Sequence, residues 1–347
     1  MRRKKITLKD MAEHFGVSLM TVSRAVHGQF GVAPETQRRI VAYAEKRGYI
    51  PSRDLYQLRT ARPSMTVGFV VPHLDATIFP AMFEAVESFF GERGWRVVMC
   101  CSYNSTIKEY RVLSSLVELG TDGILWCPVA NGGYTHLRET LTKGKKPIVF
   151  VDRLVPGWAA DSVTVDDRAA MARLVAHVVA RGCRRIAYLG ASGATSWVAK
   201  ERKAGYRQAL RKAGLAYDGR LVLDVGSDIA AGGAGANELL RRTPRPDAIC
   251  CYNDPLALGA EAALLEKGLK IPGDCALTGF SGTAATALAA VPITTARQDA
   301  AAIGLAAARL LYNRIVSAGA KAPVRKVIAT ELLLRRSTTG ARTANRA

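Results

Sequence analysis

The sequence predicts an all-α head followed by an α/β body of two parallel-sheet subdomains. In the head, apolar residues recur with the spacing of short amphipathic helices. From residue 66, continuous apolar runs such as TVGFVVP alternate with amphipathic helices such as AMFEAVESFFGERG. This alternation occurs in two successive series, which favours two parallel sheets, each with helices on both faces. The 347 residues, 49% of them hydrophobic, are enough for two or three domains.

The head contains a predicted helix-turn-helix. Thr7 stands where an N-cap belongs, Gly16 breaks the first helix in a short turn, and Ser18 can cap a second helix. Such a pair of helices places the second one in the major groove of DNA, although an ordinary helical hairpin within a larger core would give the same pattern. The apolar residues expected inside are Leu8, Met11, Ala12, Phe15, Val22, Ala25 and Val26.

The charge distribution favours a nucleic-acid partner for the head. The chain carries a net charge of +20, and residues 1–62 hold thirteen Lys or Arg against five Asp or Glu. A basic arm, Arg2 to Lys5, precedes the first helix, and further cations lie on the third. A concentrated positive field of this kind is typical of polyanion binding. A proteome rich in arginine would explain the excess in the body but not its concentration in the head.

A connector, YIPSRDLYQLRTARPS, follows the head. Pro51 stops the preceding helix, and Ser52 can cap a short helix that carries Leu55 and Leu58 on one side. Because a lone helix of about eight residues is not stable in water, we expect it to form only on a DNA minor groove beside a dimer partner. A plain linker is the alternative.

The composition argues against several other classes of protein. No apolar run reaches the length of a membrane span, and no secretory signal follows the basic N-terminus. The seven cysteines include no C-x-x-C pair and read as buried, reduced thiols, which favours the cytoplasm. Phosphate-loop, dinucleotide-binding and H-E-x-x-H motifs are absent, and the five histidines are scattered. We therefore expect no enzyme, no cofactor and no metal.

Several motifs, taken together in their order along the chain, resemble the lactose-repressor (LacI/GalR) family of transcription regulators. They are VSLMTVSRAVHG at 17–28, GYIP at 48–51, TVGFVVP at 66–72, VDR at 151–153, RKAGY at 202–206, YNDPLALGA at 252–260, GFSG at 279–282 and ITTARQD at 293–299. The resemblance covers essentially the whole chain. It implies a periplasmic-binding-protein-like body, a homodimer on double-stranded operator DNA of palindromic sequence, and a small effector, a sugar or sugar derivative. The segments MTVSR, ARGCRRIAYLGA and GFSG are similar to the gluconate-utilisation repressor branch.

The resemblance also implies a domain plan. It places the DNA-binding domain at 1–50, a hinge helix or linker at 51–63, an effector-binding and dimerisation domain at 64–340, and a tail at 341–347. The two subdomains would comprise 64–162 plus 293–322, and 163–292 plus 323–340. The alternative is a solute-binding protein or an α/β enzyme on the same body, since a fold alone does not fix a function.

For DNA, the resemblance singles out residues of the first two helices and of the connector. Arg24 would read a guanine or a phosphate, while Leu19 and Met20, apolar where the family is often polar, can contact a thymine methyl. Leu58 would wedge between base steps and kink the DNA. The expected DNA-binding residues are Thr7, Ser18, Leu19, Met20, Thr21, Ser23, Arg24, His27 and Leu58.

For the effector, the resemblance singles out strand ends and the crossings between subdomains, because ligands of open α/β sheets sit at the carboxyl ends of strands. Arg202 matches a family arginine that grips effector oxygens. Asp152 and Arg153 could instead pair with one another, and Asp254 could instead cap the helix that starts at Pro255. The expected effector-binding residues are Asp75, Phe79, Asp152, Arg153, Trp197, Arg202, Asp254 and Gln298.

Overall fold

The computed structural model separates the chain into two compact units, Met1–Pro63 and Ser64–Ala347. Each is described by itself. The structure describes residues 6–26, 31–47, 64–74, 78–129, 134, 138, 141, 146–191, 197–317 and 322–339. The predicted connector helix at 52–59, with Leu58, lies outside these residues, as do His27 and Asp75.

The head is a three-helix unit of α1 (Leu8–Phe15), α2 (Leu19–Val26) and α3 (Pro34–Lys46). Thr7 caps α1 reciprocally with Asp10: the Thr7 backbone N–H donates to Asp10 Oδ2 at 2.8 Å, and the Asp10 N–H donates to Thr7 Oγ1 at 3.3 Å. Gly16 ends α1 in the left-handed region, with φ of 63°. The core consists of Met11, Val22, Ala25, Ile40 and Ala44, and the other predicted apolar positions pack around it half-buried. The predicted helix-turn-helix is confirmed.

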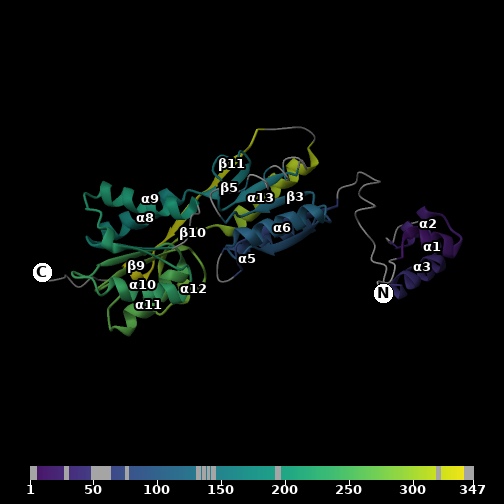
Figure 1. The fold of residues 1–347 in the computed structure, drawn as a ribbon. Coiled ribbons are helices and arrows are strands. Elements are labelled where there is room, and N and C mark those ends of the chain that lie inside the picture. Colours follow the sequence, from purple (N-terminus) through teal and green to yellow (C-terminus); the bar gives the residue numbers. More distant parts are fainter. Residues whose placement is uncertain are drawn as a thin grey trace. The chain divides into compact units, whose positions relative to one another are not determined.

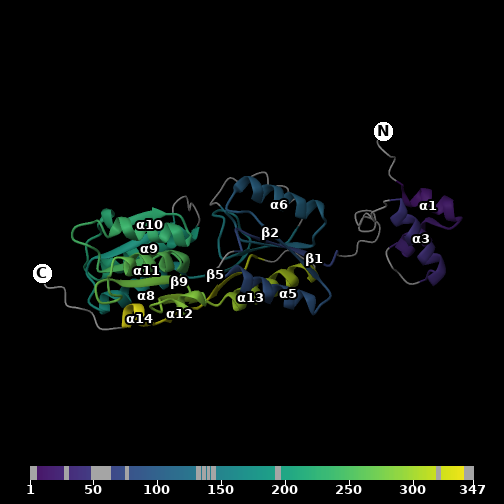
Figure 2. The same cartoon turned by 90° about the horizontal axis from the view of Figure 1, so that it is seen from below.

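The first subdomain of the body is built on sheet A, in which every neighbouring pair of strands is parallel. Helix α6 (Thr106–Glu118) covers one face, and α5 (Phe79–Gly91) and α13 (Ala300–Val316) cover the other (Figure 2). The strand order is β11 (Arg325–Ile328), β5 (Asp161–Val165), β4 (Ile148–Val151), β3 (Gly123–Trp126), β1 (Thr66–Val71) and β2 (Arg96–Cys101). Because strands buried on both faces need apolar residues at every position, β1 reads as the continuous run TVGFVV.

The second subdomain is built on sheet B. Figure 1 shows α8 (Asp167–Ala180) and α9 (Trp197–Lys212) on one face and α10 (Ile229–Leu239) and α11 (Asp254–Glu266) on the other. The strand order is β12 (Thr330–Leu333), β10 (Thr294–Gln298), β9 (Ala276–Ser281), β8 (Ala248–Cys251), β6 (Ile186–Ala191) and β7 (Val222–Val225), parallel except for β10 against β12. Short elements η1 (Gly219–Leu221), α12 (Ala285–Leu288) and α14 (Arg336–Thr339) complete it. The predicted fold class is confirmed.

The chain crosses between the two sheets three times, and each crossing comes later than the sequence suggested. Strand β5 stays in sheet A to Val165. Strand β10 joins sheet B, although residues 293–322 were predicted to belong to the first subdomain. Strand β11 joins sheet A, although residues 323–340 were predicted to belong to the second. The limits near 162, 292 and 322 therefore move to 166, 299 and 329. An apolar run predicts a strand but does not predict which of two similar sheets that strand will join. The predicted subdomain limits therefore differ from the observed ones.

Candidate DNA-reading helix and inter-subdomain site

Helix α2 presents one face away from the core of the head. Its buried residues are Val22 and Ala25, which pack against α1 and α3. Met20 is 60% exposed, and Arg24, one turn further along the helix, is exposed as well. Both therefore lie where a groove of DNA can reach them. Leu19 and Ser23 are half-buried beside them.

The hydroxyl residues expected at the DNA surface also cap the helices. Ser18 Oγ accepts from the Thr21 backbone N–H at 3.1 Å and lies 2.9 Å from Thr21 Oγ1. Thr7 Oγ1 donates to Asp10 Oδ2 at 2.7 Å. Thr7 and Ser18 are exposed. Their local hydrogen bonds fix the N-termini of α1 and α2, and backbone N–H groups at a helix N-terminus can donate to phosphates.

In the body, the end of β4 places a strained acid at the junction of the subdomains. Asp152 follows β4 with φ of 65°, a left-handed conformation that costs free energy outside glycine. Its carboxylate is nearly buried, lies 3.9 Å from Arg153 Nε, and accepts from Gln298 Nε2 at 3.2 Å. Asp152 therefore does pair with Arg153, and it also reaches across to the strand that carries Gln298.

Arg153 points from this strand end toward the loops of the first subdomain. Its Nη1 donates to Asn104 Oδ1 at 3.2 Å and to the Pro128 carbonyl at 3.5 Å. The loop that holds this carbonyl is fixed by buried Glu109, which accepts from Trp126 Nε1 and the Val129 N–H, both at 2.8 Å. Burial raises the pKa of Glu109, an effect that these donors oppose.

Arg202 anchors the other side of the junction. It lies on α9, is 3% exposed, and donates through Nε to Asp167 Oδ1 at 2.8 Å and through Nη1 to the Tyr252 carbonyl at 2.7 Å. Its guanidinium carbon lies 3.6 Å from the centre of the Phe280 ring, a cation–π contact. Burial raises the pKa of Asp167 to about 7, although the neighbouring Arg202 opposes this rise.

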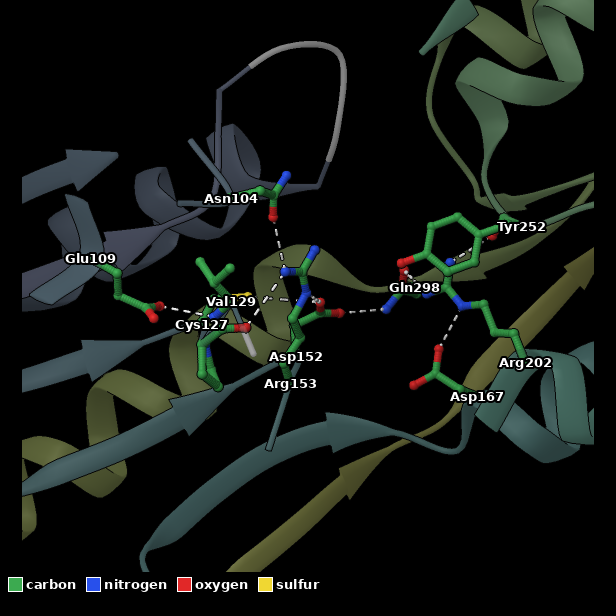
Figure 3. Close-up of polar contacts among 11 residues, drawn as sticks. Asn104, Glu109, Cys127, Val129, Asp152, Arg153, Asp167, Arg202, Tyr252 and Gln298 are labelled. Carbon is green, nitrogen blue, oxygen red and sulfur yellow. Dashed lines mark hydrogen bonds and ion pairs between the residues drawn. The ribbon is translucent and has the colours of Figure 1, made fainter. Parts of the chain in front are cut away.

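Gln298 connects the two sides. It ends β10 just before the chain crosses into sheet A, and its amide accepts from Arg202 Nη2 at 3.4 Å while donating to Asp152. A continuous chain of polar contacts therefore links the two subdomains (Figure 3). We call it the junction chain, and it runs through Arg153, Asp152, Gln298, Arg202 and Asp167.

Two buried atoms of the junction chain, Arg153 Nε and Asp167 Oδ2, have no hydrogen-bond partner among the residues that the structure describes. A buried polar group without a hydrogen-bond partner costs free energy. A ligand atom that forms the missing hydrogen bond removes this cost, so such a group is a candidate ligand contact. Arg153 Nε is a hydrogen-bond donor and Asp167 Oδ2 is an acceptor. We call them the two orphaned atoms, and together they suit a ligand that carries hydroxyl or carboxyl groups.

The remaining described residues that were expected to bind the effector are Phe79, Trp197 and Asp254, and they are not part of the junction chain. Phe79 begins α5 and is buried, and Trp197 begins α9 half-buried against the core of the second subdomain. Asp254 is fully buried, and its carboxylate accepts from the Thr283 N–H at 2.6 Å, from Thr283 Oγ1 at 3.0 Å and from Thr295 Oγ1 at 2.7 Å. The cap of α11 is Asn253 rather than Asp254. Asp254 therefore ties the loop after β9 to the sheet.

Sequence reasoning missed Asn104, Asp167, Tyr252 and Phe280. Asp167 had a signal, because it belongs to the acidic pair Asp166-Asp167 that follows the strand SVTV, and Asp152 likewise comes after the strand IVFV. Tyr252 contributes a carbonyl and Phe280 an aromatic face, which no pattern of polar residues reveals. Within the described residues, no three His, Cys, Asp or Glu side chains are grouped closely enough to hold a metal ion, and no helix has the length and apolar character to cross a membrane.

The comparisons with known proteins now decide the family. Residues 7–52 match the model described as bacterial regulatory proteins, lacI family, and residues 175–338 match a periplasmic binding protein-like domain. The transcriptional regulator MalR of Streptomyces coelicolor is 32% identical over 343 residues, covering 96% of this chain and 97% of its own. The chain belongs to the lacI family. It is thus a DNA-binding transcriptional regulator and not an enzyme.

Two further lacI-family comparisons extend over nearly the full length. The transcriptional repressor PurR of Mannheimia succiniciproducens is 30% identical, covering 95% of this chain and 98% of its own. The solved complex of the transcriptional regulator CelR with cellobiose has a TM-score of 0.71 and 29% identity, covering 96% of this chain and 99% of that one. The fold is thus shared by a family member whose structure holds a sugar.

Proposed function

We propose that this regulator represses a carbohydrate or sugar-acid utilisation operon in the cytoplasm, binding a palindromic operator as a homodimer. The exposed face of α2 supports the DNA-reading role: Arg24 reads a base edge, and Leu19 and Met20 contact a thymine methyl. The backbone contacts come from Thr7, Ser18, Thr21 and Ser23. His27 and Leu58, outside the described residues, are proposed to extend this interface.

The effector is proposed to bind at the junction chain, and the two orphaned atoms of Arg153 and Asp167 carry this proposal. A sugar hydroxyl can accept from Arg153 Nε, and another can donate to Asp167 Oδ2. Asp75, Phe79 and Trp197 are proposed to flank the ligand. Asp254, whose oxygens are engaged by Thr283 and Thr295, is proposed to position the neighbouring loop instead of touching the ligand.

An anionic effector fits the charge of the junction chain better than a neutral one. Two guanidinium groups, of Arg153 and Arg202, face two carboxylates, and burial weakens the charge of one carboxylate by raising the pKa of Asp167. Together with the similarity to the gluconate-utilisation branch, this favours a sugar acid over a neutral sugar.

Ligand binding is proposed to act on DNA through the angle between the subdomains. A ligand shifts a conformational equilibrium only if it binds one state better, and a molecule that bridges Arg153 of the first subdomain and Asp167 of the second favours the state in which both are within reach. That change is proposed to alter the spacing of the two connectors in the dimer, and hence the formation of the helix at 52–59.

Calorimetric titration of the full-length protein with gluconate and with neutral hexoses tests the effector proposal. Arg202→Lys keeps a cation beside Asp167 but loses the planar fork, so it should bind effector at least about tenfold more weakly. Arg241→Lys, the same change at an exposed site just after α10, should bind as the wild type does. Binding of neutral hexoses alone would refute the sugar acid, and an Arg202→Lys protein with unchanged affinity would refute the site.

A further inference from the structure

The region between α8 and α9 of the second subdomain is rich in Lys and Arg. A pocket of about 370 Å³ is lined there by seven residues, of which five are Lys or Arg and none is acidic. Small-molecule pockets have volumes of roughly 300–1,000 Å³, so this one has the size for a ligand. Figure 1 shows the two helices side by side on one face of sheet B.

The cations of this basic pocket form a regular row. Lys200, Lys203, Arg207 and Arg211 follow one another on α9 at steps of three or four residues, and Arg168 faces them from α8. Such spacing places like charges on one face of the helix, where they repel one another. Consecutive cations rise by about 6 Å along the axis per four residues. A bound anion with several negative groups in a row would relieve the repulsion along the whole row.

Three of the cations are already held in position. Arg168 makes two bonds to Glu201, from Nε at 2.9 Å and from Nη2 at 3.0 Å. Lys203 pairs with Asp224, and Arg207 donates to the Tyr217 hydroxyl at 3.1 Å while lying over its ring. Side chains fixed before binding lose little entropy when a ligand arrives.

In the part of the chain that the structure describes, the ion pairs of these cations involve Arg168 and Lys203 and not the two ends of the row. Lys200 and Arg211 are both exposed, and neither is engaged by Glu201 or Asp224. Guanidinium groups match phosphate oxygens in planar, two-bond geometry, whereas lysine adds point charge. From this arrangement we propose that the basic pocket binds a compact oligophosphate, a short chain of phosphate groups either free or as part of a nucleotide.

Calorimetry of the full-length protein with inorganic triphosphate, ATP and orthophosphate tests this proposal. We expect triphosphate to bind about tenfold or more tightly than orthophosphate, because it reaches several cations of the row. Equal affinity for triphosphate and ATP identifies the phosphate chain as the recognised group, and tighter binding of ATP identifies a nucleotide. Both results support the basic pocket only if the variants below behave as stated.

Two double variants separate the basic pocket from general attraction to a basic protein. Lys200→Gln/Arg211→Gln removes the ends of the row, whereas Lys212→Gln/Lys267→Gln removes the same charge from exposed sites that do not line the pocket. The first pair should weaken triphosphate binding about tenfold and the second less than about twofold. Equal weakening by both pairs, no weakening by either, or no binding to the wild type would overturn the proposal. The basic head is unchanged in all of these proteins, so binding there would survive both double variants.

Discussion

Removing Arg202 should destabilise the body of this regulator far more than a typical arginine substitution. In Arg202→Ala, Asp167 loses its 2.8 Å donor, and the Tyr252 carbonyl and Gln298 lose theirs. Asp167 is 2% exposed, so water does not replace the lost donor. Breaking a buried ion pair by deleting one partner costs about 3–5 kcal/mol, and we expect a loss of that size in the free energy of unfolding.

A second substitution separates the loss of charge from the loss of packing. In Arg202→Ala/Asp167→Asn the uncompensated carboxylate is gone, whereas the cavity left by the guanidinium remains. If the buried charge dominates, the double variant should be more stable than the sum of the single losses predicts, by about 1–3 kcal/mol. Arg241→Ala, at an exposed position, provides the control and should cost less than about 0.5 kcal/mol.

Urea unfolding of Arg202→Ala, Asp167→Asn, their double variant, the control Arg241→Ala and the wild type, followed by tryptophan fluorescence and circular dichroism, gives the required free energies. The two probes must agree, because a two-subdomain body can unfold in more than one step. Strictly additive losses in the double variant would refute the argument, since they would mean that Asp167 does not depend on Arg202. A loss below about 1 kcal/mol for Arg202→Ala would show that water reaches the site.

Four further outcomes are expected. Arg24→Ala should weaken binding to a specific operator by about 1–3 kcal/mol and relax specificity at one base pair per half-site; equal weakening on random DNA in the same gel-shift assay would contradict base reading. Thr7→Ala breaks the reciprocal cap of α1 and should lower the stability of the head by about 0.5–2 kcal/mol, seen as an earlier thermal transition, whereas Thr7→Ser should not. The raised pKa of Asp167 favours the protonated carboxyl in the folded state, so the contribution of Asp167 to the free energy of unfolding is greatest below its unfolded pKa and is lost as pH rises through about 7. Asp167→Asn should flatten the plot of unfolding free energy against pH in this range, and an unchanged slope would contradict the raised pKa of Asp167. Light scattering at micromolar concentration should give a dimer, because the segment after Leu334 has no apolar heptads to build a tetramer, and a stable monomer or tetramer would count against this expectation.

The sequence was most informative where local rules decide the structure. The cap at Thr7, the turn at Gly16 and the inward positions Val22 and Ala25 all depend on neighbours within a few residues, and all appear as expected. The alternation of apolar runs and helices likewise predicted the parallel sheets, because strands that are buried on both faces appear in the sequence as continuous apolar runs.

The positions of the crossings and the contacts of the site depend on residues far apart in the chain. Strand β11 joins sheet A by pairing Val327 with Thr164, a choice that nothing near residue 327 encodes. Arg202 and Asp152, both predicted to bind the effector, are connected through Gln298, and this connection spans about 150 residues of sequence. Asp254 was predicted to contact a ligand because it follows a strand, and its hydrogen bonds with Thr283 and Thr295 come from residues that lie 29 and 41 positions away in the sequence.

The late crossings have a consequence for how the protein is made. Sheet A is not complete when the ribosome finishes β5 at Val165, since its edge strand β11 and its covering helix α13 come from residues 300–328. At translation rates of about 5–20 residues per second, the nascent first subdomain waits roughly 8–33 s for them. During that time the apolar face of sheet A that α13 later covers, which includes Leu125 and Val149, is exposed on an unfinished chain. Sheet B is completed later still, since its edge strand β12 and helix α14 come from residues 330–339, so neither subdomain can finish folding until residues 325–339 have been made.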